Sequence, residues 1–315
     1  MYEYDVSLGL PHTNHAGLAE HLLLMYAGNV HWTSIATAIG SPLSTLRTSG
    51  GGEVYAAFYF IEERFPAGMP ISAFKLGDNL HFAVSLRAFK SIAVEGQIVF
   101  DHKDRLERTL AGITDRPLDD VAGQHPFIRF GSIFITPESG NSLLRVAPPA
   151  NTDFSSIPPL PNEENPYQLV RAAQENDRLG VLDDAWICID ERPGFDATYA
   201  IDIDRDTNGA GLVYFANYVA FMDSAERLAM ALNAEGRFCN ADVVGRSIHR
   251  RRIAYYGNAD VTDTIRTRVS LFVRVDDHRA LGLRYAIHRE RDGLLICRSE
   301  AIKFLPTPEE VQQRR

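Results

Sequence analysis

Alternating apolar and polar residues predict half-buried antiparallel strands in both halves of the chain. In the first half these stretches are Val54 to Ile61, Leu80 to Phe89 and Ser91 to Phe100. In the second half they are Arg252 to Tyr256, Thr264 to Val275, Leu281 to Arg289 and Leu294 to Phe304. The short turn Arg291-Asp292-Gly293 separates the last two stretches and predicts a hairpin.

An apolar run of helical length precedes the strands in each half. The first runs from Leu18 to Gly28, and the second from Tyr214 to Leu232. In the second run, apolar residues recur at steps of three and four: Phe215, Tyr218, Val219, Met222, Ala225, Leu228 and Ala229. Because much of the helix circumference is apolar, we expect buried helices. One buried helix followed by a series of long strands, present twice, is typical of an α+β fold.

Short sequence matches support a duplication. Thr13 to Leu18 (TNHAGL) recurs as Thr207 to Leu212 (TNGAGL), with five of six positions identical at an offset of 194 residues. Asp78 to Leu86 aligns with Asp263 to Leu271 in the same order, at an offset of 185. A shorter loop in the second copy, around Phe65 to Pro70 of the first, explains the difference in offset.

Proline-rich sequence lies between the copies. Pro148, Pro149, Pro158, Pro159 and Pro161 fall among Ser, Asn and Glu residues, which favours an extended connection. We therefore predict an N-terminal unit over residues 1–146, a linker over 147–190 with a short helix from Tyr167 to Leu179, and a C-terminal unit over 191–315.

Composition narrows the class of protein. The chain has 315 residues, enough for two domains of about 150 residues each. Its net charge of −9 argues against a nucleic-acid partner. Three widely spaced cysteines without a CxxC pair indicate a reducing compartment. We expect a cytoplasmic protein, because the N-terminus lacks the pattern of a signal peptide and no apolar stretch is long enough to span a membrane.

The segment from Asp206 to Tyr218 (DTNGAGLVYFANY) resembles the D-x-D-x-x-G-x-V-x-(F/Y)-x-N-Y motif of hot-dog thioesterases. The resemblance implies a tandem (double) hot-dog fold, in which an antiparallel sheet wraps a long central helix in each unit. It also implies a glycine-bearing turn, with Gly209 and Gly211 here and Gly17 in the first copy, that brings a thioester carbonyl to a helix N-terminus. The family's second Asp, which helps attack the thioester, is replaced by Asn208, and this argues against simple hydrolysis.

Two segments of the first copy resemble a narrower family, the double hot-dog acyltransferase/decarboxylase of leinamycin-type polyketide biosynthesis. They are Gly9 to Leu18 with Gly28 to Trp32, and Gly51 to Phe60 (GGEVYAAFYF). This resemblance implies a protein that decarboxylates methylmalonyl-CoA and passes the acyl group to an acyl carrier protein. It implies an acyl-accepting tyrosine, for which Tyr55 is the best match and Tyr59 the competitor.

Further residues are assigned by chemistry. A phenol is a poor nucleophile at neutral pH, so Tyr55 needs activation, for which His15 is the candidate and His12 the second. Asn14 and Asn208 are neutral donors that can bind a carboxylate or an enolate oxygen without repulsion. Arg250 and Arg252 are candidates for the phosphates of CoA, although a charged edge strand is an equally good explanation.

Three functions remain open. The first is the acyltransferase/decarboxylase acting on methylmalonyl-CoA or malonyl-CoA. The second is a thioesterase or dehydratase of acyl-CoA or acyl carrier protein substrates, and the third a non-catalytic acyl-binding partner of an assembly line. We expect no cofactor beyond CoA or phosphopantetheine as the substrate carrier, and no metal, because the histidines lack ligand spacing. A monomer would suffice, although pairing of strand edges into a homodimer is left open.

Overall fold

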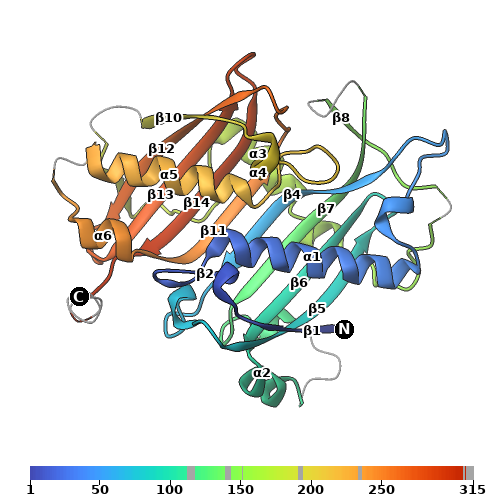
Figure 1. Cartoon of the computed structure of the whole chain (residues 1–315), viewed down its shortest axis with the longest axis horizontal. Coiled ribbons are helices and arrows are strands. Elements are labelled where there is room, and N and C mark those ends of the chain that lie inside the picture. The colour runs from blue at the N-terminus through green and yellow to red at the C-terminus, as the bar shows by residue number, and fades with distance from the viewer. Residues whose placement is uncertain are drawn as a thin grey trace. The chain divides into compact units, whose positions relative to one another are not determined.

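A computed structural model of the chain describes residues 1–111, 118–138, 143–150, 152–190, 194–232, 236–307 and 309 (Figure 1). The chain divides into two compact units, Met1–Val170 and Arg171–Arg315. The sequence-predicted boundaries at 146/147 and 190/191 remain predictions, and residues 191–193, beside the second, lie outside the described residues. None of the helices in the described part of the chain is long and apolar enough to cross a membrane.

In the first unit, α1 (Glu20–Ile39) lies across one face of an antiparallel sheet (Figure 1). The strand order is β1 (Tyr2–Ser7), β5 (Asn79–Phe89), β6 (Ala93–His102), β7 (Phe127–Pro137) and β4 (Tyr55–Arg64), and β8 (Leu144–Val146) pairs with the end of β7. The smaller elements are the hairpin β2 (Thr13–Asn14) and β3 (Gly17–Leu18), the helix α2 (Lys103–Leu110), and the 3₁₀ turns η1 (Leu10–His12), η2 (Leu43–Thr45), η3 (Ile71–Ala73), η4 (Leu118–Asp120) and η5 (Asn162–Glu164). The boundary between the two units falls within α3 (Tyr167–Asn176), after Val170.

The second unit repeats this arrangement. Its long helix is α5 (Asn217–Leu232), and Figure 1 shows it across the sheet. The strand order is β10 (Phe195–Ala200), β12 (Thr264–Arg274), β13 (Ala280–Arg289), β14 (Leu295–Phe304) and β11 (Ser247–Tyr255), with β9 (Trp186–Cys188) paired to β12. Two short helices, α4 (Ile203–Asp206) and α6 (Asn240–Gly245), flank α5.

The pairing of the edge strand with its neighbour repeats in the two units, which confirms the duplication. Tyr2 pairs with Val84 in the first unit, and Phe195 pairs with Val269 in the second. These partners are offset by 193 and 185 residues, and the second offset is the one that aligned the strand sequences. The bend after each edge strand also repeats, because Leu8 N donates to Asp78 O at 2.8 Å and Ile201 N donates to Asp263 O at 3.0 Å.

The first-unit core is built between α1 and the sheet. Rings of Phe58 and Phe130 lie 4.6 Å apart and contact the ring of His31 on α1. His31 Nε2 lies 2.7 Å from Ser132 Oγ, so the buried imidazole has a polar partner. Burial lowers the pKa of His31 to about 3 and keeps it neutral. Phe58 on β4 and Phe130 and Ser132 on β7 therefore face α1. Gly131, between the last two, faces away from it.

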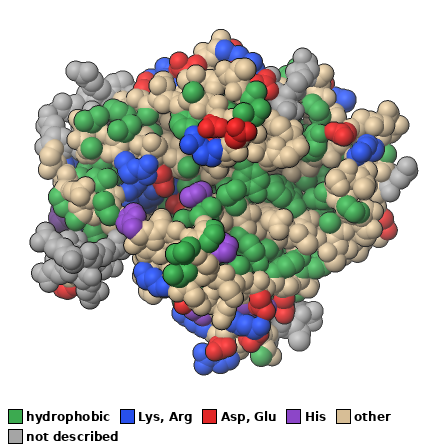
Figure 2. Space-filling model, viewed as in Figure 1, with side chains coloured by type: hydrophobic (Ala, Val, Ile, Leu, Met, Phe, Trp, Pro, Cys, Tyr) green, Lys and Arg blue, Asp and Glu red, His purple; other side chains and the backbone are tan. Residues whose placement is uncertain are grey.

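The predicted helix in the first copy ended at Gly28, but α1 continues to Ile39. Gly28 is buried within the helix and does not end it; the helix ends at Gly40, whose φ of +66° is left-handed. The proline-rich segment packs on the first unit: Ala88 N donates to Pro158 O and Leu160 N to Ala88 O, each at 2.8 Å. On the face of the molecule in Figure 2, acidic and basic side chains are interspersed.

Candidate functional site

The two repeated turns use their asparagines in the same way. Asn14 Oδ1 accepts a hydrogen bond from Ala16 N at 2.8 Å. Asn208 Oδ1 accepts from Ala210 N at 3.0 Å and from Leu212 N at 3.1 Å. The two residues therefore hold equivalent places. Their side-chain carbonyls are engaged inside the turns, so the amide N–H groups are what each can offer to a ligand.

The glycines of these turns shape the backbone before the helices. Gly17 and Gly211 have φ values of +131° and +72°, which L-residues rarely adopt. Gly209 has open space where a Cβ would lie. The helices begin only at Glu20 and Asn217, so these glycines do not lie in the first helical turns, where a carbonyl would meet unpaired N–H groups.

The two candidate histidines lie near the start of α1. His12 Nδ1 accepts from Gly9 N at 2.9 Å, which stabilises the 3₁₀ turn η1. His15 is exposed in the loop between β2 and β3. Their participation in catalysis remains a prediction.

Tyr55 lies at the opposite end of the first unit from His15. It begins β4, after the loop that follows the C-terminal end of α1. The far end of β4 leads into the segment that contacts the first turn, where Leu18 N donates to Phe74 O at 2.9 Å. The ten residues of β4 span about 30 Å. The structure therefore does not bring Tyr55 together with His12, His15, Asn14 or Gly17, and His15 is not placed to activate Tyr55.

The carboxylate of Glu53, and not His15, lies beside the hydroxyl of Tyr55. Tyr55 OH donates to Glu53 Oε2 at 2.5 Å. Arg47 is held nearby by a backbone bridge to Glu53, and its Nη1 donates to Ser44 O at 2.9 Å and to Leu46 O at 2.8 Å. These three side chains are exposed or half-buried and accessible to a ligand. We call Arg47, Glu53 and Tyr55 the β4 entry site.

The electrostatics of the β4 entry site define its chemistry. The hydrogen bond to Glu53 and partial burial raise the pKa of Tyr55, and the charge of Arg47 opposes this only in part. The phenol is therefore neutral at pH 7 and must lose its proton during any attack. Glu53 already accepts that hydrogen bond, so it is placed to act as the general base.

Glu53, the hydrogen-bond partner of Tyr55, was not among the residues singled out from the sequence. It stands two positions before Tyr55 in the GGEVY segment. In an extended chain, residues two apart point to the same side. An acidic residue two positions before a candidate tyrosine was therefore a usable signal.

Tyr59 lies on the same strand but in a different environment. Its ring is buried, and its OH donates to Asn165 Oδ1 at 3.0 Å. Burial, together with the charge of Glu95, raises the pKa of Tyr59 far above the usual range for a phenol. Tyr59 is therefore a weaker candidate than Tyr55 for the acyl-accepting residue.

The arginine run of the second unit alternates across β11. Arg251 is fully buried and faces α5, where its Nη2 lies 3.5 Å from an oxygen of Asp223. Arg250 and Arg252 are half-buried on the opposite face. Arg252 Nη1 donates to Leu179 O at 2.8 Å, so part of its guanidinium fixes the backbone of the same unit. Phosphate binding by Arg250 and Arg252 remains a prediction.

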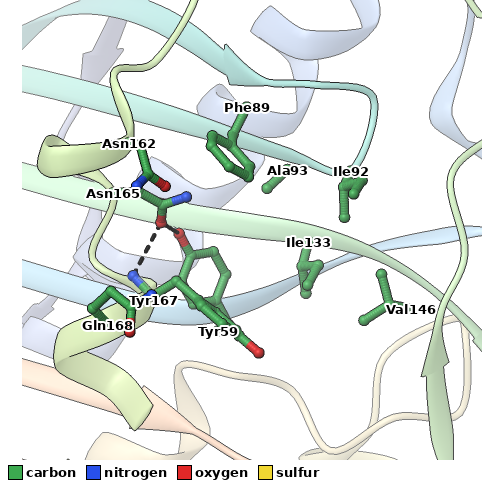
Figure 3. A pocket seen from close by; sticks show the side chains of 10 residues that line it. All are labelled: Tyr59, Phe89, Ile92, Ala93, Ile133, Val146, Asn162, Asn165, Tyr167 and Gln168. Carbon is green, nitrogen blue, oxygen red and sulfur yellow. Dashed lines mark hydrogen bonds between the residues drawn. The ribbon is translucent and has the colours of Figure 1, made fainter. Parts of the chain in front are cut away.

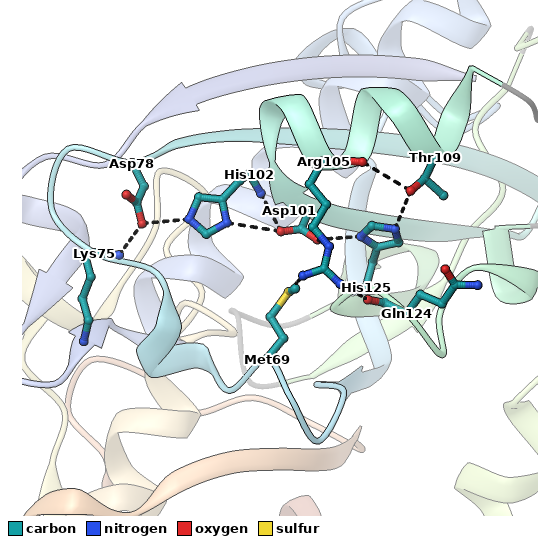
Figure 4. Close-up of polar contacts among 9 residues, drawn as sticks. All are labelled: Met69, Lys75, Asp78, Asp101, His102, Arg105, Thr109, Gln124 and His125. Atoms are coloured by element: carbon teal, nitrogen blue, oxygen red, sulfur yellow. Dashed lines mark hydrogen bonds and ion pairs between the residues drawn. The ribbon is translucent and has the colours of Figure 1, made fainter. Parts of the chain in front are cut away.

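A second polar cluster lies around the buried carboxylate of Asp101 (Figure 4). Asp101 accepts from His125 Nδ1 at 2.6 Å and from His102 N at 2.7 Å, and His125 Nε2 lies 3.0 Å from Thr109 Oγ1 on α2. These contacts join α2 to the sheet, which is a structural role. Within the described ranges, no three His, Cys, Asp or Glu side chains are grouped to hold a metal ion.

Comparison with known proteins identifies the fold. No family model matches the chain, and no curated protein gives a significant match. Many solved structures match, and the following three are among those that cover nearly the whole chain. An acyl-ACP thioesterase from Bacteroides thetaiotaomicron is 11% identical with a TM-score of 0.58, covering 96% of this chain and 97% of its own. A protein named oleoyl thioesterase from Lactobacillus plantarum is 10% identical with a TM-score of 0.62, covering 97% of each chain.

The third structure is the 12:0-ACP thioesterase from Umbellularia californica. It is 8% identical with a TM-score of 0.60, and the match covers 97% of this chain and 94% of that one. Identities this low establish the fold and leave the activity to be argued from the site. The chain has the α+β tandem hot-dog fold predicted from its sequence, with a long helix against an antiparallel sheet in each unit.

Proposed function

We propose that the protein is an acyltransferase/decarboxylase that takes methylmalonyl-CoA or malonyl-CoA, releases CO₂ and transfers the remaining acyl group to the phosphopantetheine of an acyl carrier protein. The observation that carries the proposal is the 2.5 Å hydrogen bond from Tyr55 to Glu53 beside Arg47. The three fold neighbours are named as thioesterases, two of them for acyl carrier protein substrates, which supports a thioester substrate.

The proposed chemistry begins with Tyr55. As its oxygen attacks the thioester carbonyl, Glu53 takes the phenolic proton and passes it to the leaving CoA thiolate, which leaves an acyl ester on Tyr55. Arg47 supplies the positive charge for the substrate carboxylate or the developing oxyanion. Loss of CO₂ gives an enolate that takes a proton from water, and the thiol of the carrier protein then attacks the ester and releases Tyr55.

Intact-mass analysis tests this order of events. Incubation with methylmalonyl-CoA should add an acyl mass to the wild-type protein, and carrier protein should remove it. Tyr55→Phe should form no adduct, and Glu53→Gln should slow adduct formation by roughly 10²–10⁴-fold, the usual contribution of a general base. Tyr4→Phe is a matched control, since Tyr4 is a half-buried strand tyrosine at the other edge of the sheet. Full transfer by Tyr55→Phe contradicts the proposal.

Hydrolysis is the second candidate, and the same carboxylate favours it. Glu53 is exposed and could activate water in place of Tyr55. A hydrolase would release free acid without an adduct and would keep its activity in Tyr55→Phe while losing it in Glu53→Gln. If every CoA ester is left unchanged by the wild-type protein, both enzymatic functions fail and a non-catalytic acyl-binding role is favoured.

A further inference from the structure

A pocket of about 380 Å³ lies on the face of the first-unit sheet that points away from α1 (Figure 3). Its floor includes Tyr59 and Ile133, which alternate with the α1-facing Phe58 and Ser132 along their strands. The proline-rich connection after β8 supplies the opposite wall. The pocket therefore lies outside the helix-covered core, and its volume falls in the usual range for small-molecule sites.

One end of the pocket is apolar. It is lined by side chains from β5, β6, β7, β8 and the turn between β5 and β6, namely Phe89, Ile92, Ala93, Ile133 and Val146. Figure 3 shows these side chains grouped together, apart from the polar residues. This end suits an alkyl chain or a ring.

The other end is formed by Tyr59 and three side-chain amides. A β-bulge at Tyr59 interrupts the register of β4 with β7, which is a common way to re-aim a side chain. Its ring lies over Gly131, where a Cβ would come within 2.7 Å of Tyr59 Cζ. A glycine inside a strand often marks a place where another group approaches the backbone closely, as the ring of Tyr59 does here.

Asn165 is held so that its amide nitrogen is available. Its Oδ1 accepts from Tyr59 OH and from Tyr167 N, each at 3.0 Å. Those two bonds fix the side chain and leave the Nδ2 donors, which have no acceptor among the described residues. Figure 3 shows Asn162 and Gln168 on either side of Asn165, so three amides gather at this end.

The charges around this end are already paired. Arg87 and Arg129 both bind the buried carboxylate of Glu95, at 2.7 Å in each case, and Arg87 also pairs with Glu164. Neither of these arginines is left over for an anionic ligand at the amide end, and Lys90 lies over the ring of Phe89 at the apolar end. Burying a carboxylate without a partner is costly. The ligand's polar group should therefore be uncharged.

We propose that this pocket binds an uncharged small molecule with an apolar chain or ring that ends in a carbonyl group, which accepts hydrogen bonds from the amide of Asn165 and its neighbours. This assignment does not depend on the function proposed for the β4 entry site. Along β4, Tyr55 and Tyr59 are about 13 Å apart.

The test measures binding of 2-nonanone and octanoate to the full chain by isothermal titration calorimetry. The two probes share the same alkyl tail and differ in the charge of the oxygen-bearing end. We expect 2-nonanone to bind and octanoate to bind at least roughly tenfold more weakly. No binding of the ketone up to its solubility limit, or equal binding of octanoate, would overturn the proposal.

Asn165→Asp is the sharpest variant. The new carboxylate can keep both accepted hydrogen bonds, but it removes the N–H donors and adds a negative charge, so 2-nonanone should bind roughly tenfold or more weakly. Asn176→Asp is the control, because Asn176 Oδ1 accepts from Arg178 N at 3.0 Å in the same kind of turn outside the pocket. Val146→Trp, at a site 46% exposed, should also reduce binding by narrowing the apolar end without disturbing the core. Unchanged affinity in both Asn165→Asp and Val146→Trp contradicts the proposal.

Discussion

Lys303 offers a test of how charge is buried in the second unit. Its side chain is 3% exposed, and Nζ lies 2.7 Å from both Asp223 Oδ1 and Glu226 Oε2. Glu226 is fully buried and also binds Arg246 and the hydroxyl of Tyr285, the latter at 2.8 Å. Lys303→Met keeps most of the side-chain volume and removes the cation.

The loss of stability expected for Lys303→Met depends on the partners that Asp223 and Glu226 keep. Breaking a buried ion pair from one side typically destabilises a protein by about 3–5 kcal/mol, because the partner is left charged and desolvated. Glu226 keeps Arg246 and Tyr285, and Asp223 keeps Arg251 and is 27% exposed, so water relieves part of the loss. We therefore expect about 3 kcal/mol, near the lower limit of that range. This is a large part of the total stability of an ordinary domain.

The pH dependence has a definite sign. Burial raises the pKa of Asp223 and of Glu226, but the charges of Lys303 and the neighbouring arginines outweigh it, so both pKa values lie below their usual range. Carboxyls with lowered pKa stabilise the folded state above about pH 4 and lose that contribution as the pH falls. The difference between wild type and Lys303→Met should therefore be complete at pH 7 and shrink below about pH 4.

Urea unfolding followed by circular dichroism, repeated between pH 3 and 7, measures this difference. The control is Lys103→Met, because Lys103 also lies 2.6 Å from a carboxylate, that of Asp5, but both side chains are about half exposed. Surface pairs of this kind contribute little. If Lys303→Met is no more destabilising than Lys103→Met at pH 7, the reasoning from burial is wrong.

Three further predictions follow from close contacts in the first unit, each measured by urea unfolding. Gly131→Ala should displace the ring of Tyr59 and destabilise the unit by about 1–3 kcal/mol, whereas no effect would mean the ring moves freely. Asp101→Asn should cost about 1–3 kcal/mol at pH 7 through its bond to His125. Because the pKa of Asp101 is lowered in the folded protein, this loss should shrink as the pH falls below about 4, and a loss independent of pH would contradict an ionised Asp101. Gly17→Ala should cost about 1–3 kcal/mol, because its φ of +131° and the crowding at its Cβ exclude a side chain, and a stable variant would contradict that.

The duplicated framework was readable from the sequence because its signals are local. The apolar pattern predicted β5, β6, β12, β13 and β14 to within about two residues at each end. In β12 one face is more buried than the other, whereas β6 is buried on both faces. The strands β1, β7 and β10 were missed. In the short edge strands β1 and β10, burial alternates only between half-buried and exposed positions, so their sequences carry weak apolar contrast.

The arrangement of the candidate site was not readable in the same way. His15 and Tyr55 were paired because each matched a motif, but motifs separated by a long helix carry no information about distance. The length of α1 places them at opposite ends of the unit. The helix itself was predicted too short, because the apolar run that predicted it stops at Gly28, whereas α1 continues to Ile39 with Gly28 buried inside it.

The difference between the repeated strands and the variable connections indicates where new chemistry can arise in a duplicated chain. The register of the edge strand with its neighbour repeats in the two units, and shifting it by one position would turn the apolar side chains to the other face. The connection from the long helix to the next strand is not held in this way. In the first unit it carries Arg47 and Glu53 and leads into Tyr55, whereas in the second it forms α6 and leads into the arginine run of β11. A repeat in the sequence therefore locates the framework, and the residues that differ between the copies are the ones to search for function.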